Sequence, residues 1–268
     1  MWALKLVLFL AASYAVVLAA IFFAQTSLLF PARMAGASAP LPATARPLSL
    51  NLDGGERLHG LHIPPRQLQK GPKLLILGFG GNAWNAQDVA EFLHELFPEV
   101  DVAAFHYRGY APSTGSPSAA ALLADAPLVH DLAVQEIGAE RVVAIGFSIG
   151  TGVAAHLAAE RKLSGVILVT PFDSLAAVAG GHYPWLPARL LLRHSMEPRA
   201  ELLGSATRVA LIAAEQDTLI PSERARALAT DLPNLVFDRT IAGTGHNDIY
   251  RHPAFRNAVR EALERLQR

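Results

Sequence analysis

The sequence predicts an α/β protein with a doubly wound, mostly parallel sheet, and three observations support this. Short β-like runs alternate with helical patterns from residue 48 to the carboxyl end. Several of these runs are apolar at every position, as expected for strands that are covered on both faces. Finally, 51% of the 268 residues are hydrophobic and 17% are charged, against about 25% charge in an average soluble domain.

The N-terminal segment, residues 1–30, is predicted to be a transmembrane signal anchor. From Leu6 to Ala24 the chain is apolar except for Ser13 and Tyr14. About 20 apolar residues in a helix span the ~30 Å hydrocarbon layer of a membrane. One alternative is a cleaved signal peptide, which has a shorter apolar region of about 7–15 residues and a cleavage site close behind it, and the other is a buried core helix.

The expected orientation places the amino terminus in the cytoplasm and the catalytic domain on the extracytoplasmic side. Lys5 and the amino terminus lie on one side of the span, and Arg33 and Arg46 lie on the other. Two positive charges thus lie on each side, so the positive-inside rule gives little preference between the two orientations.

Residues 31–47 are rich in Pro, Ala and Ser and lack periodicity, which predicts a linker before a domain over residues 48–268. The first two runs of that domain are joined by Asp53-Gly54-Gly55, a hairpin signal that predicts an antiparallel edge. The expected strands are 48–52, 58–63, 74–79, 102–107, 142–147, 166–170, 209–213 and 235–241. The expected helices are 87–96, 119–136, 151–161, 222–232 and 253–267, and residues 171–208 leave room for two short helices and a turn.

The pattern Gly146-Phe147-Ser148-Ile149-Gly150 follows an apolar run and opens a helical stretch. A sharp turn between a strand and a helix is the setting of a nucleophile elbow, which raises a serine hydroxyl above the edge of the sheet. Glycines are needed beside the serine because side chains would collide in so tight a turn. Ser148 is therefore the candidate nucleophile.

A serine nucleophile needs a base that takes its proton and an acid that orients the base. In this arrangement the acid follows a late strand and the histidine lies between the last strand and the last helix. Asp217 and His246 occupy those places, and Asp173 is the alternative acid. Asp248 lies two residues beyond His246, where it is suited to orienting the loop.

Ester hydrolysis also needs donors for the developing oxyanion. The expected donors are the backbone N–H groups of Ile149 and Asn82, with Gly81 as the alternative to Asn82. Tyr183 and Trp185 are expected to form an apolar wall over the substrate pocket. The other residues expected at the pocket are Phe79, Trp84 and Leu219.

Seven segments resemble those of the α/β-hydrolases, in particular the small, N-terminally anchored serine hydrolases of the bud-emergence type, also labelled serine-aminopeptidase-like. They are QTSLLFPAR, GFGGNAWN, HYRGYAPSTGSPS, GFSIGTGVAAHLA, PFDSLAAVA, AAEQDTLIP and GTGHNDIY. The resemblance covers about residues 25–265. It implies an α/β-hydrolase fold with a minimal lid, in which Ser148 is the nucleophile, Asp217 the acid and His246 the base.

The sequence departs from the family pattern at two positions. Gly80 stands where the family usually has a histidine, which removes a side chain that normally braces the oxyanion loop. Thr151 stands where a second glycine is commoner, so a backbone contact at the elbow is expected to be lost.

Together these features predict a membrane-anchored serine hydrolase that acts on small-molecule or lipid-like esters or thioesters. The alternatives are an aminopeptidase or amidase of the same fold and a catalytically degenerate, membrane-tethered binding module. No metal, cofactor or nucleic-acid partner is expected, because metal motifs and a complete dinucleotide loop are missing and Lys plus Arg equals Asp plus Glu, at 23 each. Neither acyl length nor oligomeric state follows from these patterns.

Overall fold

A computed structural model describes residues 1–36, 43–67 and 71–268. Its centre is an eight-stranded sheet in the order β1-β2-β4-β3-β5-β6-β7-β8, in which β1 and β2 run antiparallel to their neighbours and the other strands are parallel. This confirms the predicted mostly parallel sheet with an antiparallel edge. The strands are β1 (Arg46–Asn51), β2 (Arg57–Ile63), β3 (Leu74–Phe79), β4 (Asp101–Phe105), β5 (Arg141–Phe147), β6 (Gly165–Val169), β7 (Val209–Ala214) and β8 (Leu235–Ile241).

Helices cover both faces of the sheet, which explains why its central strands are apolar at every position. One core contains side chains of α2 and α9, and the other contains side chains of α3, α4, α7 and α8. The α-helices of the domain are α2 (Ala86–Leu96), α3 (Ala119–Ile137), α4 (Gly150–Glu160), α5 (Leu175–His182), α6 (Ala188–Leu191), α7 (Pro198–Leu203), α8 (Ser222–Ala229) and α9 (Pro253–Gln267), with short 3-10 turns η1 (Ala32–Met34) and η2 (Ile249–Arg251).

The strand order reverses beside β3, because β4 lies on one side of it and β5 on the other. Ligands of open α/β sheets bind at such a switch point, outside the carboxyl ends of the strands. The loop after β3 begins at residue 80 and the elbow after β5 begins at Ser148, so both lie at this edge.

Most element boundaries differ from the sequence predictions by one to three residues, and two differences change the organisation. β1 begins at Arg46, inside the predicted linker, because Arg46 already pairs with His62 of β2. The segment between β6 and β7 forms three short helices, α5, α6 and α7, where two were expected. Part of the predicted linker, residues 37–42, lies outside the described residues.

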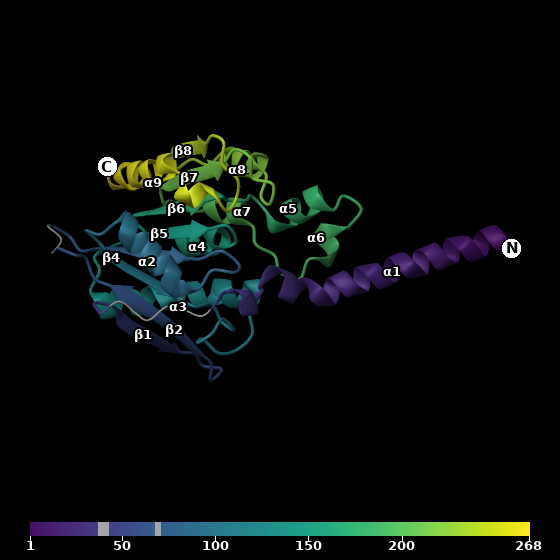
Figure 1. The fold of residues 1–268 in the computed structure, drawn as a ribbon, viewed down its shortest axis with the longest axis horizontal. Helices are drawn as coiled ribbons and strands as arrows, with labels where there is room; N and C mark the ends of the chain where they lie inside the picture. Colours follow the sequence, from purple (N-terminus) through teal and green to yellow (C-terminus); the bar gives the residue numbers. More distant parts are fainter. Residues whose placement is uncertain (37–42, 68–70) are drawn as a thin grey trace.

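The N-terminal helix α1 (Trp2–Leu29) is long and apolar enough to cross a membrane. Its most apolar 18 residues have a mean hydropathy of 2.6, and none of them is buried against the rest of the chain. In Figure 1 its N-terminal half projects away from the domain, while α5 and α6 lie near its C-terminal half.

The C-terminal end of α1 is bound to the segment after α6 by polar contacts. Gln25 is buried, and its side-chain amide donates to the carbonyl of Leu191 while its carbonyl accepts from the N–H of Arg193, both at 2.8 Å. One residue further, Thr26 Oγ1 lies 2.9 Å from Nε2 of His194. Burial, and to a lesser extent Arg193, lowers the pKa of His194, so that its ring is neutral at pH 7.

Replacing Gln25 with alanine is expected to weaken this attachment, because it leaves the carbonyl of Leu191 and the N–H of Arg193 without partners. The free energy of unfolding is expected to fall by about 1–3 kcal/mol. Each kcal/mol lowers Tm by roughly 2–4 °C in a protein of this size. Thermal unfolding of the full chain in detergent measures it. Ser27→Ala, at an exposed position of the same helix, is the matched control and is expected to leave Tm within about 1 °C. Equal Tm values for the two variants would contradict the role given to Gln25.

Candidate active site

The elbow between β5 and α4 holds Ser148 in a left-handed conformation, with φ at 52°. Only glycine fits at the positions two residues before and two residues after it. A Cβ on Gly146 would lie 2.4 Å from the carbonyl oxygen of Gly150, and a Cβ on Gly150 would lie 2.3 Å from that of Phe79. The turn is fixed further by the N–H of Ser148, which donates to the carbonyl of Val169 at 3.0 Å. These contacts hold the serine side chain above the switch point.

The structure brings the three predicted residues together in one buried array. Nε2 of His246 lies 3.0 Å from Oγ of Ser148, and Nδ1 lies 2.7 Å from Oδ2 of Asp217. The second carboxylate oxygen of Asp217 accepts from the N–H groups of Leu219 and Ile220, at 2.9 and 2.7 Å. Because the carboxylate accepts the Nδ1 proton, the neutral imidazole presents the lone pair of Nε2 to the serine hydroxyl.

The alternative acid, Asp173, lies elsewhere and forms an ion pair with Arg224 at 3.3 Å. Asp248 has the loop-orienting position suggested by the sequence, since its carboxylate accepts from the N–H of Gly245 at 2.7 Å, next to His246.

A partly buried phenol lies close enough to Asp217 to be affected by its charge. Burial, and to a lesser extent the carboxylate of Asp217, raises the pKa of Tyr250 to about 12 although a hydrogen bond with Thr170 lowers it. Tyr250 is therefore neutral at physiological pH and adds no charge beside the imidazole.

The predicted oxyanion donors lie at the same place as the nucleophile. Asn82, Ser148 and Ile149 all line one cavity, and a Cβ on Gly81 would lie 3.6 Å from Cβ of Ser148. Within the described residues, the backbone N–H groups of Asn82 and Ile149 make no hydrogen bond to the protein. Both are therefore free to bind a substrate oxygen.

Two tyrosines brace the loop after β3, and sequence reasoning missed them. The hydroxyl of Tyr107 donates to the carbonyl of Gly80 at 2.9 Å, and that of Tyr110 donates to the carbonyl of Asn82 at 2.6 Å. Burial raises the pKa of both phenols, which keeps them protonated as donors. Both tyrosines belong to the segment HYRGYAPSTGSPS, but nothing in that segment indicates which loop its hydroxyl groups reach.

Thr151 also contributes a contact to the elbow, where a lost contact was expected. Its side chain is fully buried, and its hydroxyl donates to the carbonyl of Ser148 at 2.6 Å. Thus neither departure from the family pattern disturbs the array: tyrosines brace the loop at Gly80, and a hydroxyl ties the elbow at Thr151.

The cavity above Ser148 has a volume of about 510 Å³ and is mostly apolar. It contains three of the predicted pocket residues, Tyr183, Trp185 and Leu219. Sequence reasoning missed its other wall, which is formed by Ile21, Gln25, Leu28 and Leu29 of α1.

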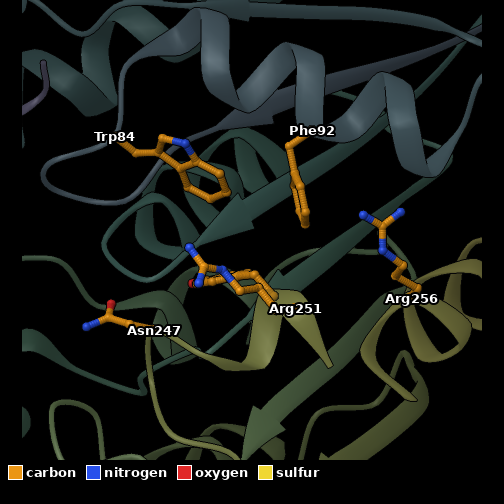
Figure 2. Close-up of a pocket in the computed structure, with 6 residues that line it drawn as sticks. Trp84, Phe92, Asn247, Arg251 and Arg256 are labelled. Carbon is orange, nitrogen blue, oxygen red and sulfur yellow. The ribbon is translucent and has the colours of Figure 1, made fainter. Parts of the chain in front are cut away.

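The prediction that Phe79 and Trp84 line this cavity is wrong. Phe79 is buried in the core beneath the elbow. Trp84 lines a separate hollow of about 460 Å³ with Phe92, Asn247, Tyr250, Arg251 and Arg256. Its ring packs against those of Phe92, Phe147 and Tyr250, with centroids 5.1–5.6 Å apart, and Figure 2 shows Trp84 and Phe92 facing Arg251 and Arg256 across this hollow. The loop after β3 thus places Trp84 among these aromatic rings and outside the cavity that Ser148 lines.

Comparisons with known proteins show the family. The model of the alpha/beta hydrolase fold matches residues 74–195. An uncharacterized protein of Mycobacterium tuberculosis is 37% identical over 220 residues, which cover 79% of this chain and 75% of that protein. The alpha/beta hydrolase domain-containing protein aho-3 of Caenorhabditis elegans is 27% identical over 69% of this chain and 55% of its own. The solved structure of the Pyrococcus furiosus esterase Pf2001 is 19% identical and superposes with a TM-score of 0.68 over 87% of this chain and 95% of that one. The chain belongs to the α/β-hydrolase family.

Gly150→Ala is expected to destabilise the domain, because the added methyl group meets the backbone carbonyls of Phe79 and Gly80, at 2.3 and 2.5 Å. Overpacking of this kind costs about 1–3 kcal/mol, which lowers Tm by at least about 2 °C. Gly180→Ala in α5 is the matched control, since a Cβ there meets nothing within 4 Å. That variant is expected to keep or slightly raise Tm, and a Gly150→Ala protein as stable as the Gly180→Ala protein would refute the steric account of the elbow.

Proposed function

We propose that this chain is a serine hydrolase that cleaves carboxylic esters or thioesters through an acyl-enzyme on Ser148. Family membership supports hydrolase activity in general. The observation that carries the finer proposal is the continuous hydrogen-bonded array from Asp217 through His246 to Ser148. Such an array activates a hydroxyl that is by itself a weak nucleophile.

In the first half of the reaction, Oγ of Ser148 attacks the carbonyl carbon of the substrate, and its proton passes to Nε2 of His246. Asp217 stabilises the imidazolium that forms. The carbonyl oxygen becomes an oxyanion and accepts hydrogen bonds from the N–H groups of Ile149 and Asn82. When the tetrahedral intermediate collapses, the bond to the alcohol or thiol breaks, and the leaving group takes the proton from Nε2.

In the second half, a water molecule attacks the acyl carbon and gives one proton to Nε2. Collapse of the second tetrahedral intermediate breaks the bond between the acyl carbon and Oγ of Ser148. The carboxylic acid leaves, and the proton on Nε2 returns to the serine. The chain's own groups thus supply the nucleophile, the base and the oxyanion donors of this cycle.

We also infer that α1 anchors the catalytic domain in a membrane, on the basis of its length and hydropathy. We expect the domain to lie on the extracytoplasmic side of that membrane, with Lys5 and the amino terminus in the cytoplasm.

Replacing Ser148 with alanine is expected to abolish covalent labelling by a fluorophosphonate probe, because the attacking oxygen is removed. Labelling is read on a denaturing gel of the full chain. Ser195→Ala, which changes an exposed serine, is the matched control and is expected to label like the parent protein. Labelling that persists in the Ser148→Ala protein would falsify the assignment of the nucleophile.

Asp217→Asn is expected to lower kcat for p-nitrophenyl acetate by two to four orders of magnitude, because the amide no longer favours the tautomer in which Nε2 accepts the serine proton. Asp173→Asn tests the other candidate acid and is expected to change kcat by less than threefold. The assignment fails if Asp173→Asn has the larger effect of the two.

A further inference from the structure

The C-terminal half of α1 does more than tether the domain, because it forms one wall of the cavity that contains Ser148. Ile21, Gln25, Leu28 and Leu29 face into this cavity. On the other side it is lined by apolar residues of α5 and the loop that follows, among them Tyr183 and Trp185. The proposed nucleophile and the helix predicted to lie in a membrane therefore line the same apolar cavity.

Two sets of hydrogen bonds show which part of α1 contacts the domain. The hydroxyl of Tyr14 donates to the carbonyl of Trp185 at 2.7 Å, and their rings lie 6.4 Å apart. Eleven residues later, Gln25 binds the backbone of Leu191 and Arg193. At 1.5 Å per residue, these two attachments lie about 16 Å apart along the helix.

The length of α1 places the first of these attachments within a bilayer. Its 28 residues extend about 42 Å, whereas the hydrocarbon layer is about 30 Å thick. The polar residues Gln25 and Thr26 lie at the end next to the domain, and Tyr14 lies in the middle of the apolar run from Leu6 to Ala24. Trp185, which touches Tyr14, is thereby brought to the membrane.

The segment after α5 exposes large apolar and aromatic side chains. Tyr183, Trp185 and Leu190 are exposed by 53, 50 and 86% of their surface, although all three are large and apolar or aromatic. Arg189 and Arg193, which are also exposed, lie nearer the end of this segment that contacts Gln25. Exposed apolar side chains of this size mark a surface that contacts a membrane or a partner, and basic residues near the headgroups are attracted to anionic lipids.

From these observations we propose that the cavity is the binding site for the acyl chain of a membrane-resident ester or thioester. The substrate enters laterally from the bilayer, between α1 and the segment of residues 183–192. The acyl chain then lies against Ile21 and Leu28, and its carbonyl group reaches Ser148 and the N–H groups of Asn82 and Ile149. This inference rests on the proposed function for the chemistry at Ser148, and it adds the substrate class and the role of α1 in selecting it.

The size and lining of the cavity support this substrate class. Its volume of about 510 Å³ falls within the usual range for small-molecule sites, about 300–1,000 Å³. Burial of each methylene group contributes about 0.8 kcal/mol, so each one added inside the cavity is expected to raise kcat/KM by roughly fourfold. Long acyl chains should be preferred over short ones until the cavity is filled.

The test compares turnover of p-nitrophenyl laurate and p-nitrophenyl acetate by the full chain in detergent. Ile21→Trp and Leu28→Trp fill the wall with a larger ring, and each is expected to lower the laurate-to-acetate ratio of kcat/KM at least tenfold. Ala19→Trp is the matched control, because Ala19 is exposed on the opposite side of the helix. It is expected to leave the ratio within twofold. If all three variants keep the parent ratio, α1 does not form the acyl site.

A second measurement does not depend on catalysis. The Ser148→Ala protein in phosphatidylcholine vesicles is irradiated with a p-nitrophenyl palmitate that carries a diazirine at the end of its chain, and the adducts are mapped by mass spectrometry. Adducts are expected on residues 21–29 and 175–192, whereas adducts confined to residues 2–20 would overturn the proposal. If the parent protein hydrolyses neither ester while the Ser148→Ala protein still gives adducts in the cavity, the acyl site is supported and the proposed function is refuted, so the two failures are distinguishable.

Discussion

The tight turn at Ser148 is the constraint on which the rest of the site depends. Ser148 has a φ of 52° and lies between Gly146 and Gly150, two residues away on each side. This conformation lets β5 pass directly into α4 and leaves the serine side chain above the sheet. Because the missing side chains of Gly146 and Gly150 let backbones approach closely, the serine lies next to the loop after β3. A single backbone turn thus brings the proposed nucleophile and the proposed oxyanion donors to the same switch point of the sheet.

The other parts of the site are attached to this turn by hydrogen bonds from different places in the chain. Tyr107 and Tyr110 hold the loop after β3, and Asp217 holds the imidazole of His246. The helix α1 is held through Gln25, so the element that is long and apolar enough to cross a membrane also forms a wall of the cavity over the serine. The proposed anchoring and the proposed substrate selection are thus two consequences of one helix.

Much of the fold followed from the sequence, because alternating apolar runs and helical patterns are local signals. The array of Ser148, Asp217 and His246 could be predicted because each residue has a fixed place relative to the strands of this fold. The roles of Tyr107 and Gln25 could not, because their partners lie 27 and at least 166 residues away in the chain and have no local pattern. Trp84 was misplaced for a similar reason, since only the packed structure shows that its ring joins Phe92, Phe147 and Tyr250.

The central claim is that an ester is cleaved by way of an acyl group on Ser148. Its most direct test is to quench the full chain with acid during steady-state turnover of a p-nitrophenyl ester and to map the acylated peptides by mass spectrometry. The account predicts that the acyl mass lies on the peptide that contains Ser148 and disappears as the substrate is exhausted. Turnover with no acyl group on that peptide, or with the acyl group on another residue, would contradict the account.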